Sequence, residues 1–270
     1  MKKIILLVIT AISLIGCNLN KKNNDWRRDN LKNRVKSINL RFYEAIEKFG
    51  QIEKGKRLEQ DELNKFTRYN KEGNKEEEIF YNRDESLKGT VKYKHDNKGN
   101  TSEAVYYTND VAFIINLRNK YGHEKSEDSL YVLKTKYKYD EKGNKVEENN
   151  YQTDGEIYSK VTFLYDNKNN LIEANKYISD GSLGLKWKYT YNKGLKTEVK
   201  VYGSNGDFRG QITFLYDEKG YVLEENRKGK NYEMRIVYKD YDLHFNWTRQ
   251  IWYEKGKPES ILEREIEYYE

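Results

Sequence analysis

The sequence predicts an all-β protein, an antiparallel meander of repeated β-hairpins that forms a twisted or curled open single sheet after a cleaved N-terminal segment. Three observations predict it. A six-residue element close to "YDEKGN" recurs along the chain, and apolar and polar residues alternate between its copies. Proline, which cannot donate to a sheet ladder, occurs once in 270 residues.

The recurring element marks a repeat of roughly 26 residues. Its first residues are Tyr69, His95, Tyr139, Tyr165, Tyr191, Tyr216 and Tyr241. The steps between them are 26, 44, 26, 26, 25 and 25 residues, so a single step is longer than the others. Periods of 20 to 50 residues are typical of stacked supersecondary units, which need their neighbours for stability.

Most repeats also carry a second tyrosine and a second turn signal; the repeat that begins at Tyr216 has Lys228 in place of the tyrosine. The second tyrosines follow the first by 11 or 12 residues, at Tyr81, Tyr107, Tyr151, Tyr177, Tyr202 and Tyr253. Pairs such as Asp154-Gly155 and Asn205-Gly206 come next, and these pairs accept positive φ at low cost and close hairpins. One repeat is therefore two strands and two turns, and the "YDEKGN" element is the slightly longer turn.

The stretches between turns alternate with the period of a strand. In "LKWKYTY" (185–191), Trp187, Tyr189 and Tyr191 share one face, and lysine and threonine occupy the other. The tyrosine of each element is predicted to be the last inward residue before the bend.

The N-terminal stretch "MKKIILLVITAISLIGC" has two lysines and an apolar run that ends before Cys17, the one cysteine of the chain. The run is shorter than the roughly 20 residues that span a bilayer and fits an export signal. Its ending resembles the bacterial lipobox, which implies cleavage and lipidation at Cys17; an ordinary signal peptide with a chance cysteine is the alternative. The chain then divides into a lipoprotein signal peptide (1–16), a polar tether (17–30) and the β-hairpin repeat domain (31–270).

The charge composition argues against a nucleic-acid partner. Charged residues make up 35% of the chain and are of both signs, and loss of Lys2 and Lys3 with the signal lowers the formal net charge from +6 to +4. This mixed surface does not predict a nucleic-acid partner. The 25 tyrosines suit a thin sheet whose rings are buried while their hydroxyls reach water.

The repeat pattern resembles the YD (tyrosine-aspartate) repeats, also called RHS-like repeats, of bacterial envelope proteins. The matching stretches are "YKYDEKGNKVEENNYQTDG" (137–155), "FLYDNKNNLIEANKYISDG" (163–181) and "FLYDEKGYVLEEN" (214–226). Residues 246–269 look like the terminal unit of small repeat lipoproteins of that group. The resemblance covers roughly residues 60–269 and implies a β-rich repeat sheet in an exported protein. Large members form hollow shells, and seven short units are expected to be too few to close one.

Two segments lie outside the regular repeat. Residues 26–50 fit both helical and strand spacing, and we favour a strand over about 34–43 after a short helix. The long step contains an insertion at about 108–135, which we interpret as two lengthened arms joined by a loop at about 118–129. That loop is either a binding loop or a tolerated surface insertion.

The search for chemistry yields no catalytic residue, metal site or cofactor. His95, His123 and His244 are not at metal-ligand spacing, and no phosphate-binding glycine loop or nucleophile motif occurs. The turns at 96–100 and 166–170 offer Asp and Asn oxygens but lack the acids of an EF-hand, so we interpret them as Asx turns.

The aromatic strip Trp187, Tyr189 and Tyr191 is the candidate ligand contact, because exposed rings could stack on sugars or dock a peptide. The alternative is that these rings hold the sheet together. Trp247 and Trp252 are expected to cap the last edge of the sheet.

The predicted function is a non-catalytic binding or structural role in a lipid-anchored repeat protein of the bacterial cell envelope. Its expected partners are the membrane, through Cys17, and a protein or carbohydrate ligand. An immunity- or antitoxin-like inhibitor at the membrane is the alternative, and a hydrolase sited on the insertion is a weaker one.

Overall fold

The computed structural model describes residues 24–59, 63–108 and 131–270, which form one short helix, α1 (Asp25–Arg28), and a single 17-stranded antiparallel sheet. The strands are β1 (Val35–Lys48), β2 (Gln51–Arg57), β3 (Lys65–Tyr69), β4 (Lys75–Tyr81), β5 (Leu87–His95), β6 (Thr101–Thr108), β7 (Tyr131–Tyr139), β8 (Lys145–Tyr151), β9 (Ile157–Tyr165), β10 (Leu171–Ile178), β11 (Leu183–Asn192), β12 (Leu195–Gly203), β13 (Phe208–Tyr216), β14 (Val222–Gly229), β15 (Glu233–Tyr241), β16 (Trp247–Glu254) and β17 (Lys257–Tyr268). Cys17 and the proposed loop at 118–129 lie outside the described residues.

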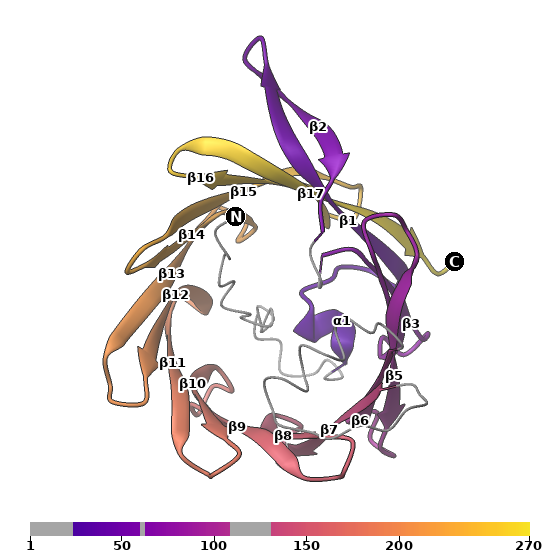
Figure 1. Ribbon diagram of the computed structural model, residues 1–270, viewed down its shortest axis with the longest axis vertical. Helices are drawn as coiled ribbons and strands as arrows, with labels where there is room; N and C mark the ends of the chain where they lie inside the picture. The colour runs from indigo at the N-terminus through magenta and orange to yellow at the C-terminus, as the bar shows by residue number, and fades with distance from the viewer. Residues whose placement is uncertain (1–23, 60–62, 109–130) are drawn as a thin grey trace.

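The sheet closes into a barrel (Figure 1). Strand β17 pairs with β1, from Val35 opposite Tyr268 to Glu44 opposite Ser260, and the first half of β1 pairs on its other side with β3. β1 and β3 to β17 thus form a closed ring of sixteen strands. The predicted open, curled sheet was wrong, because a strand from outside the repeats joins the first repeat to the last and removes both edges.

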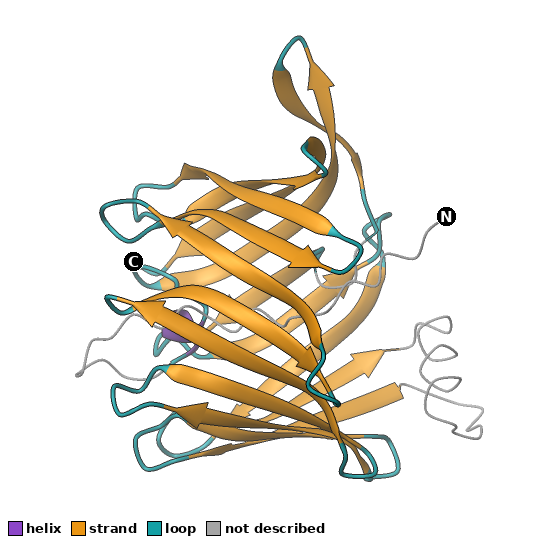
Figure 2. Ribbon diagram, turned by 90° about the vertical axis from the view of Figure 1, so that its left-hand side faces the viewer, coloured by secondary structure: helices purple, strands orange, loops and turns teal. Residues whose placement is uncertain are grey.

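The second half of β1 leaves the ring. Residues Tyr43–Lys48 pair with β2, and the resulting hairpin projects away from the barrel wall (Figures 1 and 2). Asn64, which is fully buried, holds the junction. Its side chain accepts from the Phe42 amide at 3.1 Å and donates to the Leu58 carbonyl at 2.8 Å. These two backbone groups therefore keep hydrogen-bond partners at the point where β1 changes from pairing with β3 to pairing with β2.

The recurring hexamer forms the turns of one rim, defined here as the hexamer rim (turns at 70–74, 96–100, 140–144, 166–170, 217–221 and 242–246). In the copy at 166–170, Asp166 Oδ1 accepts from the amides of Lys168 and Asn170 at 2.9 and 2.8 Å. Asn169 takes a positive φ of 62° where four other copies have glycine and the copy at 242–246 has Phe245. The predicted Asx turns are confirmed. The shortened copy instead makes a two-residue turn at Lys193-Gly194, with both φ positive.

The hexamer tyrosines tie neighbouring strands together at this rim. The Tyr165 hydroxyl donates to the Lys145 carbonyl at 2.9 Å, and Tyr191 donates to the Leu171 carbonyl at 3.0 Å. Tyr216 and Tyr241 make the corresponding bonds to the carbonyls of Lys196 and Val222, at 2.7 and 2.6 Å. Each bond joins the ends of two strands that no turn connects at this rim, so the tyrosine closes the open end of a hairpin.

Helix α1 lies inside the ring, near the hexamer rim (Figure 1). The Tyr69 hydroxyl donates to Asp29 at 2.8 Å, which places the hexamer tyrosines on the inner face, as the sequence predicts. The helix follows an Asn24 cap that accepts from the Arg27 amide. The expectation of a short helix before a strand in 26–50 is confirmed, although the strand extends to Lys48.

The seam between the last and first strands has its own apolar core. Trp252 packs edge-on against Phe42, with ring centroids 5.3 Å apart, and both belong to a buried cluster with Ile236 and Leu262. The prediction that Trp247 and Trp252 cap an edge was wrong, because β17 has neighbours on both sides. Trp252 instead fills the inner side of the closure.

Candidate functional site on the inner face of the barrel

In five of the seven repeats an aromatic residue stands two positions before the hexamer mark, on the inner face. These residues are Tyr93, Tyr137, Phe163, Tyr189 and Phe214. Two of these rings face alanine on the neighbouring strand: Tyr93 is opposite Ala104, and Phe163 is opposite Ala174. A large ring beside a small partner covers the wall without crowding, and together the five rings make an inner band of aromatic faces.

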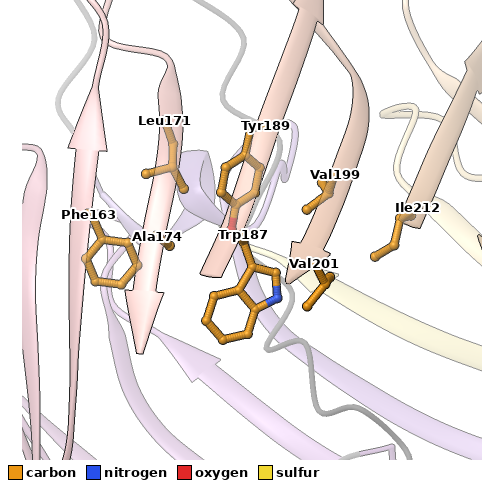
Figure 3. Close-up of a cluster of buried hydrophobic side chains, with 8 residues drawn as sticks. All are labelled: Phe163, Leu171, Ala174, Trp187, Tyr189, Val199, Val201 and Ile212. Carbon is orange, nitrogen blue, oxygen red and sulfur yellow. The ribbon is translucent and has the colours of Figure 1, made fainter. Parts of the chain in front are cut away.

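Two of the three predicted ligand contacts, Trp187 and Tyr189, lie together in this band (Figure 3). Trp187 and Tyr189 are each 8% exposed and belong to a cluster with Val199 and Val201. Tyr191 serves the sheet instead, since its hydroxyl bonds the Leu171 carbonyl. The structure therefore brings the three residues to one face of β11, and the interpretation of the rings as sheet-holding residues fits Tyr191 best.

Two polar atoms of this cluster are unusual. Trp187 Nε1 and the Tyr189 hydroxyl are buried and have no hydrogen-bond partner among the described residues. A buried donor without an acceptor costs about 1–3 kcal/mol. The buried cluster around them is mainly apolar, so these two atoms of β11 would gain from a bound acceptor.

Replacing Tyr189 with phenylalanine should therefore leave the free energy of unfolding unchanged or raise it by up to about 1 kcal/mol. The matched variant Tyr191→Phe removes a satisfied bond two residues away and should lower it by about 1 kcal/mol. Urea denaturation followed by tryptophan fluorescence measures both. Equal losses in the two variants would show that the Tyr189 hydroxyl has a partner.

Lysine side chains lie among the inner aromatic rings, and this inward placement was not predicted from the sequence. Lys145 Nζ is 5.1 and 4.7 Å from the ring centroids of Tyr137 and Phe163, and Lys196 Nζ is 4.8 Å from that of Phe214. Burial lowers the pKa of Lys196 to about 8, against the opposing effect of a nearby glutamate. The signal in the sequence is a lysine directly after the hexamer or its shortened form, at the start of the next strand.

A second charged cluster lies below α1. The carboxylate of Glu78 accepts from Lys65 at 2.8 Å and from the Tyr93 hydroxyl at 2.5 Å, and Lys75 Nζ is 3.5 Å away. Lys75 also reaches Asp29 at 3.1 Å, which links the cluster to the end of the helix. Buried carboxylates are costly unless paired in this way, so the cluster holds α1 against the wall.

The two histidines that the structure describes, His95 and His244, do not form a site. His95 lies 4.0 Å from Asp25, and burial lowers the pKa of its imidazole, which favours the neutral form. His244 contacts Asn33 and the Tyr268 ring at the hexamer rim. His123 lies outside the described residues. In the part of the chain that the structure describes, no group of three or more His, Cys, Asp or Glu side chains could hold a metal ion.

The outer face is a network of lysines and glutamates. Glu147 accepts from Lys138 at 2.7 Å and lies 3.1 Å from Lys160. Hydrogen bonds from Asn149 and Lys138 lower the pKa of Glu147 to about 2. Equivalent pairs in other repeats are Lys186 with Glu173 and Arg235 with Glu224. In these repeats the outward glutamate thus forms ion pairs with lysine or arginine side chains of adjacent strands.

Comparison with known proteins shows the fold only. A porin-like protein from Bacteroides uniformis ATCC 8492 is similar at a TM-score of 0.51 and 12% identity, over 87% of this chain and 98% of that one. A structure of TcdB2-TccC3-Cdc42 aligns at a TM-score of 0.23 and 10% identity, over 82% of this chain but 14% of that one, and supports no argument. No protein-family description and no curated protein matches. None of the helices among the described residues has the length and apolar character to cross a membrane.

Proposed function

We propose that this protein is a lipid-anchored binding protein of the bacterial cell envelope, without catalytic activity, whose barrel stands in water and takes its ligand on the inner face. One observation carries the proposal: the outer face is covered by paired lysines and glutamates, whereas the inner face carries aromatic rings with lysines among them. A barrel of sixteen strands is of the size that leaves an interior wider than its wall side chains can fill.

The outer face argues against a wall embedded in lipid. Membrane barrels present an outward apolar band about 25 Å tall. Here the outward positions in the middle of β10 and β11 pair Glu173 with Lys188 and Asn175 with Lys186. Lysine at the bilayer midplane costs about 2–4 kcal/mol for each residue. The similarity to a porin-like protein therefore supports the barrel architecture, while the charge pattern supports attachment by a tether.

Lipid anchoring through Cys17 is tested in a bacterial host fed an alkyne-tagged fatty acid. The full-length chain should carry the tag and sediment with membranes, because several acyl chains on one residue give stable anchoring. Cys17→Ser should lose the tag and move to the soluble fraction, whereas Ser13→Ala in the same segment should not. A tagged Cys17→Ser variant, or an untagged wild-type protein, would contradict the anchor.

Binding on the inner face is tested with residues 18–270 on arrays of bacterial envelope glycans and of peptides. The donors Trp187 Nε1 and Tyr189 hydroxyl should contact acceptors of the ligand. Signals retained by wild type should fall about tenfold or more in Trp187→Phe and Tyr189→Phe, since one hydrogen bond is worth about a factor of ten. The outer-face variant Lys200→Gln should bind normally. Signals that survive the inner variants would place the ligand elsewhere.

A further inference from the structure

A cavity of about 250 Å³ lies on the outer face, away from the inner band. Its lining residues are Lys134, Lys136, Tyr151, Gln152, Thr153 and Gly155. They come from β7, from the end of β8 and from the turn that follows β8. The volume suits a group of the size of a monosaccharide.

The register of the two strands explains the cavity. Lys134 is directly opposite Tyr151, and a bulge-like shift separates Asn150 from Tyr151 where β8 pairs with β9. The chain then turns back at Gly155, whose φ is +88° and whose Cβ position has no atom within 4 Å. Glycine is needed there for the positive φ, and it also leaves the floor of the cavity open.

The lining combines three kinds of group. The ammonium of Lys136 is 5.5 Å from the ring centroid of Tyr151, and Lys134 is held only loosely, 4.0 Å from Glu103. The Oε1 atom of Gln152 is buried and lacks a donor within the described chain. Cations, an aromatic ring and an unsatisfied amide oxygen beside one small cavity are the groups that recognise, respectively, an anion, an apolar ring face and a hydroxyl.

We propose that this cavity binds an acidic saccharide through a single sugar unit. The carboxylate lies between Lys134 and Lys136, the ring packs on Tyr151, and a hydroxyl donates to Gln152 Oε1 once the amide turns toward the cavity. A simple carboxylate would satisfy the lysines alone, and a neutral sugar would leave them without an anion, so each should bind more weakly than a ligand with both features.

The equivalent position two repeats further along the chain offers a natural control. Lys186 and Lys188 face Tyr202 in the same arrangement, with Lys188 Nζ 5.9 Å from the ring centroid. In place of Gln152, however, that repeat has Gly203, and the side chains of Asp207 and Arg209 occupy the space beside it. Asp207 is paired with Arg209 at 2.7 Å, and this pair fills the space next to Gly203 where the first site has Gln152, so the second site should bind an acidic sugar more weakly.

The test is saturation-transfer NMR on residues 18–270 with sodium D-glucuronate, D-glucose and sodium acetate as separate probes. Glucuronate should give ring-proton signals and bind at least tenfold more tightly than the other two. Lys134→Gln/Lys136→Gln should weaken glucuronate binding by about tenfold or more, because charge-assisted bonds to the carboxylate are lost. Tyr151→Ala should reduce the ring-proton signals, and Lys186→Gln/Lys188→Gln should bind as wild type does.

Other outcomes overturn the proposal. Equal binding of acetate and glucuronate would show an ion site without sugar recognition, and equal binding of glucose would remove the role of the lysines. No binding of glucuronate, or equal loss in the two lysine pairs, would exclude a site at this cavity. The proposal does not depend on the inner band, so Trp187→Phe should leave glucuronate binding unchanged, and failure of one test leaves the other intact.

Discussion

Replacing Glu78 with glutamine should lower the free energy of unfolding by about 3–5 kcal/mol, the usual cost of breaking a buried ion pair by removing one partner. Glu78 is 5% exposed and contacts Lys65 and Lys75. The glutamine keeps the shape and the bond from Tyr93, but it leaves the ammonium group of Lys65 without its counter-ion and that of Lys75 with Asp29 alone. Urea denaturation of the purified barrel at pH 7 measures the loss.

Glu76→Gln is the matched control. Glu76 pairs with Arg68 at 3.1 Å, but both side chains are nearly half exposed, so the change should cost less than about 1 kcal/mol. Equal costs for Glu76→Gln and Glu78→Gln would show that the cluster under α1 is open to solvent.

The same residue should give the barrel an acid-sensitive stability. Burial alone would raise the pKa of Glu78, but the charges of Lys65 and Lys75 outweigh it and leave the pKa well below the ordinary value of 4.5. A lowered carboxyl pKa stabilises the fold above the unfolded pKa, and this contribution is lost as pH falls through the folded pKa. The wild-type protein should lose stability below about pH 4.5, and Glu78→Gln should lose less over that range.

Replacing Trp252 with alanine should lower the free energy of unfolding by about 3–5 kcal/mol, as expected for deletion of a buried aromatic side chain. The indole is 6% exposed, packs on Phe42 across the seam and donates from Nε1 to Gln250 at 3.0 Å. Because Phe42 comes from β1 and Trp252 from β16, the variant tests the closure of the ring directly. Thermal and urea unfolding both report the loss.

Phe49 provides the contrast, because it is an aromatic side chain fully exposed at the tip of the projecting hairpin. Phe49→Ala should change the free energy of unfolding by no more than about 0.5 kcal/mol. If Trp252→Ala costs as little as Phe49→Ala, the first and last strands do not meet, and the sheet is open in solution.

The hairpins could be predicted from the sequence because their causes are local. The Asp and Gly of each turn and the alternation in stretches such as 185–191 act within a few residues of one another. Closure depends on β1, which lies within residues 26–50, a stretch that carries no repeat and fits two periodicities. Its pairing with β17 joins Ile38 to Ile266, a contact between the two ends of the chain, and nothing in a local pattern encodes that.

The candidate site was predicted in part. The aromatic spacing places Trp187, Tyr189 and Tyr191 on one face, but the spacing is the same whether the rings serve the sheet or a ligand. Only the three-dimensional contacts separate them: Tyr191 has a carbonyl partner, and Tyr189 has none among the described residues. The inner lysines were not predicted because 35% of the residues are charged. In such a chain, the presence of a lysine at a position does not indicate whether its side chain is buried or exposed.

The tyrosine hydrogen bonds at the hexamer rim fix the register of the two strands that each of them joins. A shift of two residues along a strand keeps the inner and outer faces correct, so the alternation of side chains cannot oppose it. Such a shift would move the Lys145 carbonyl by about 7 Å relative to the Tyr165 hydroxyl, far outside bonding reach. A two-residue register shift, which the hydrophobic pattern tolerates, therefore costs the tyrosine hydrogen bond. Each hairpin that carries the tyrosine has this safeguard of its own.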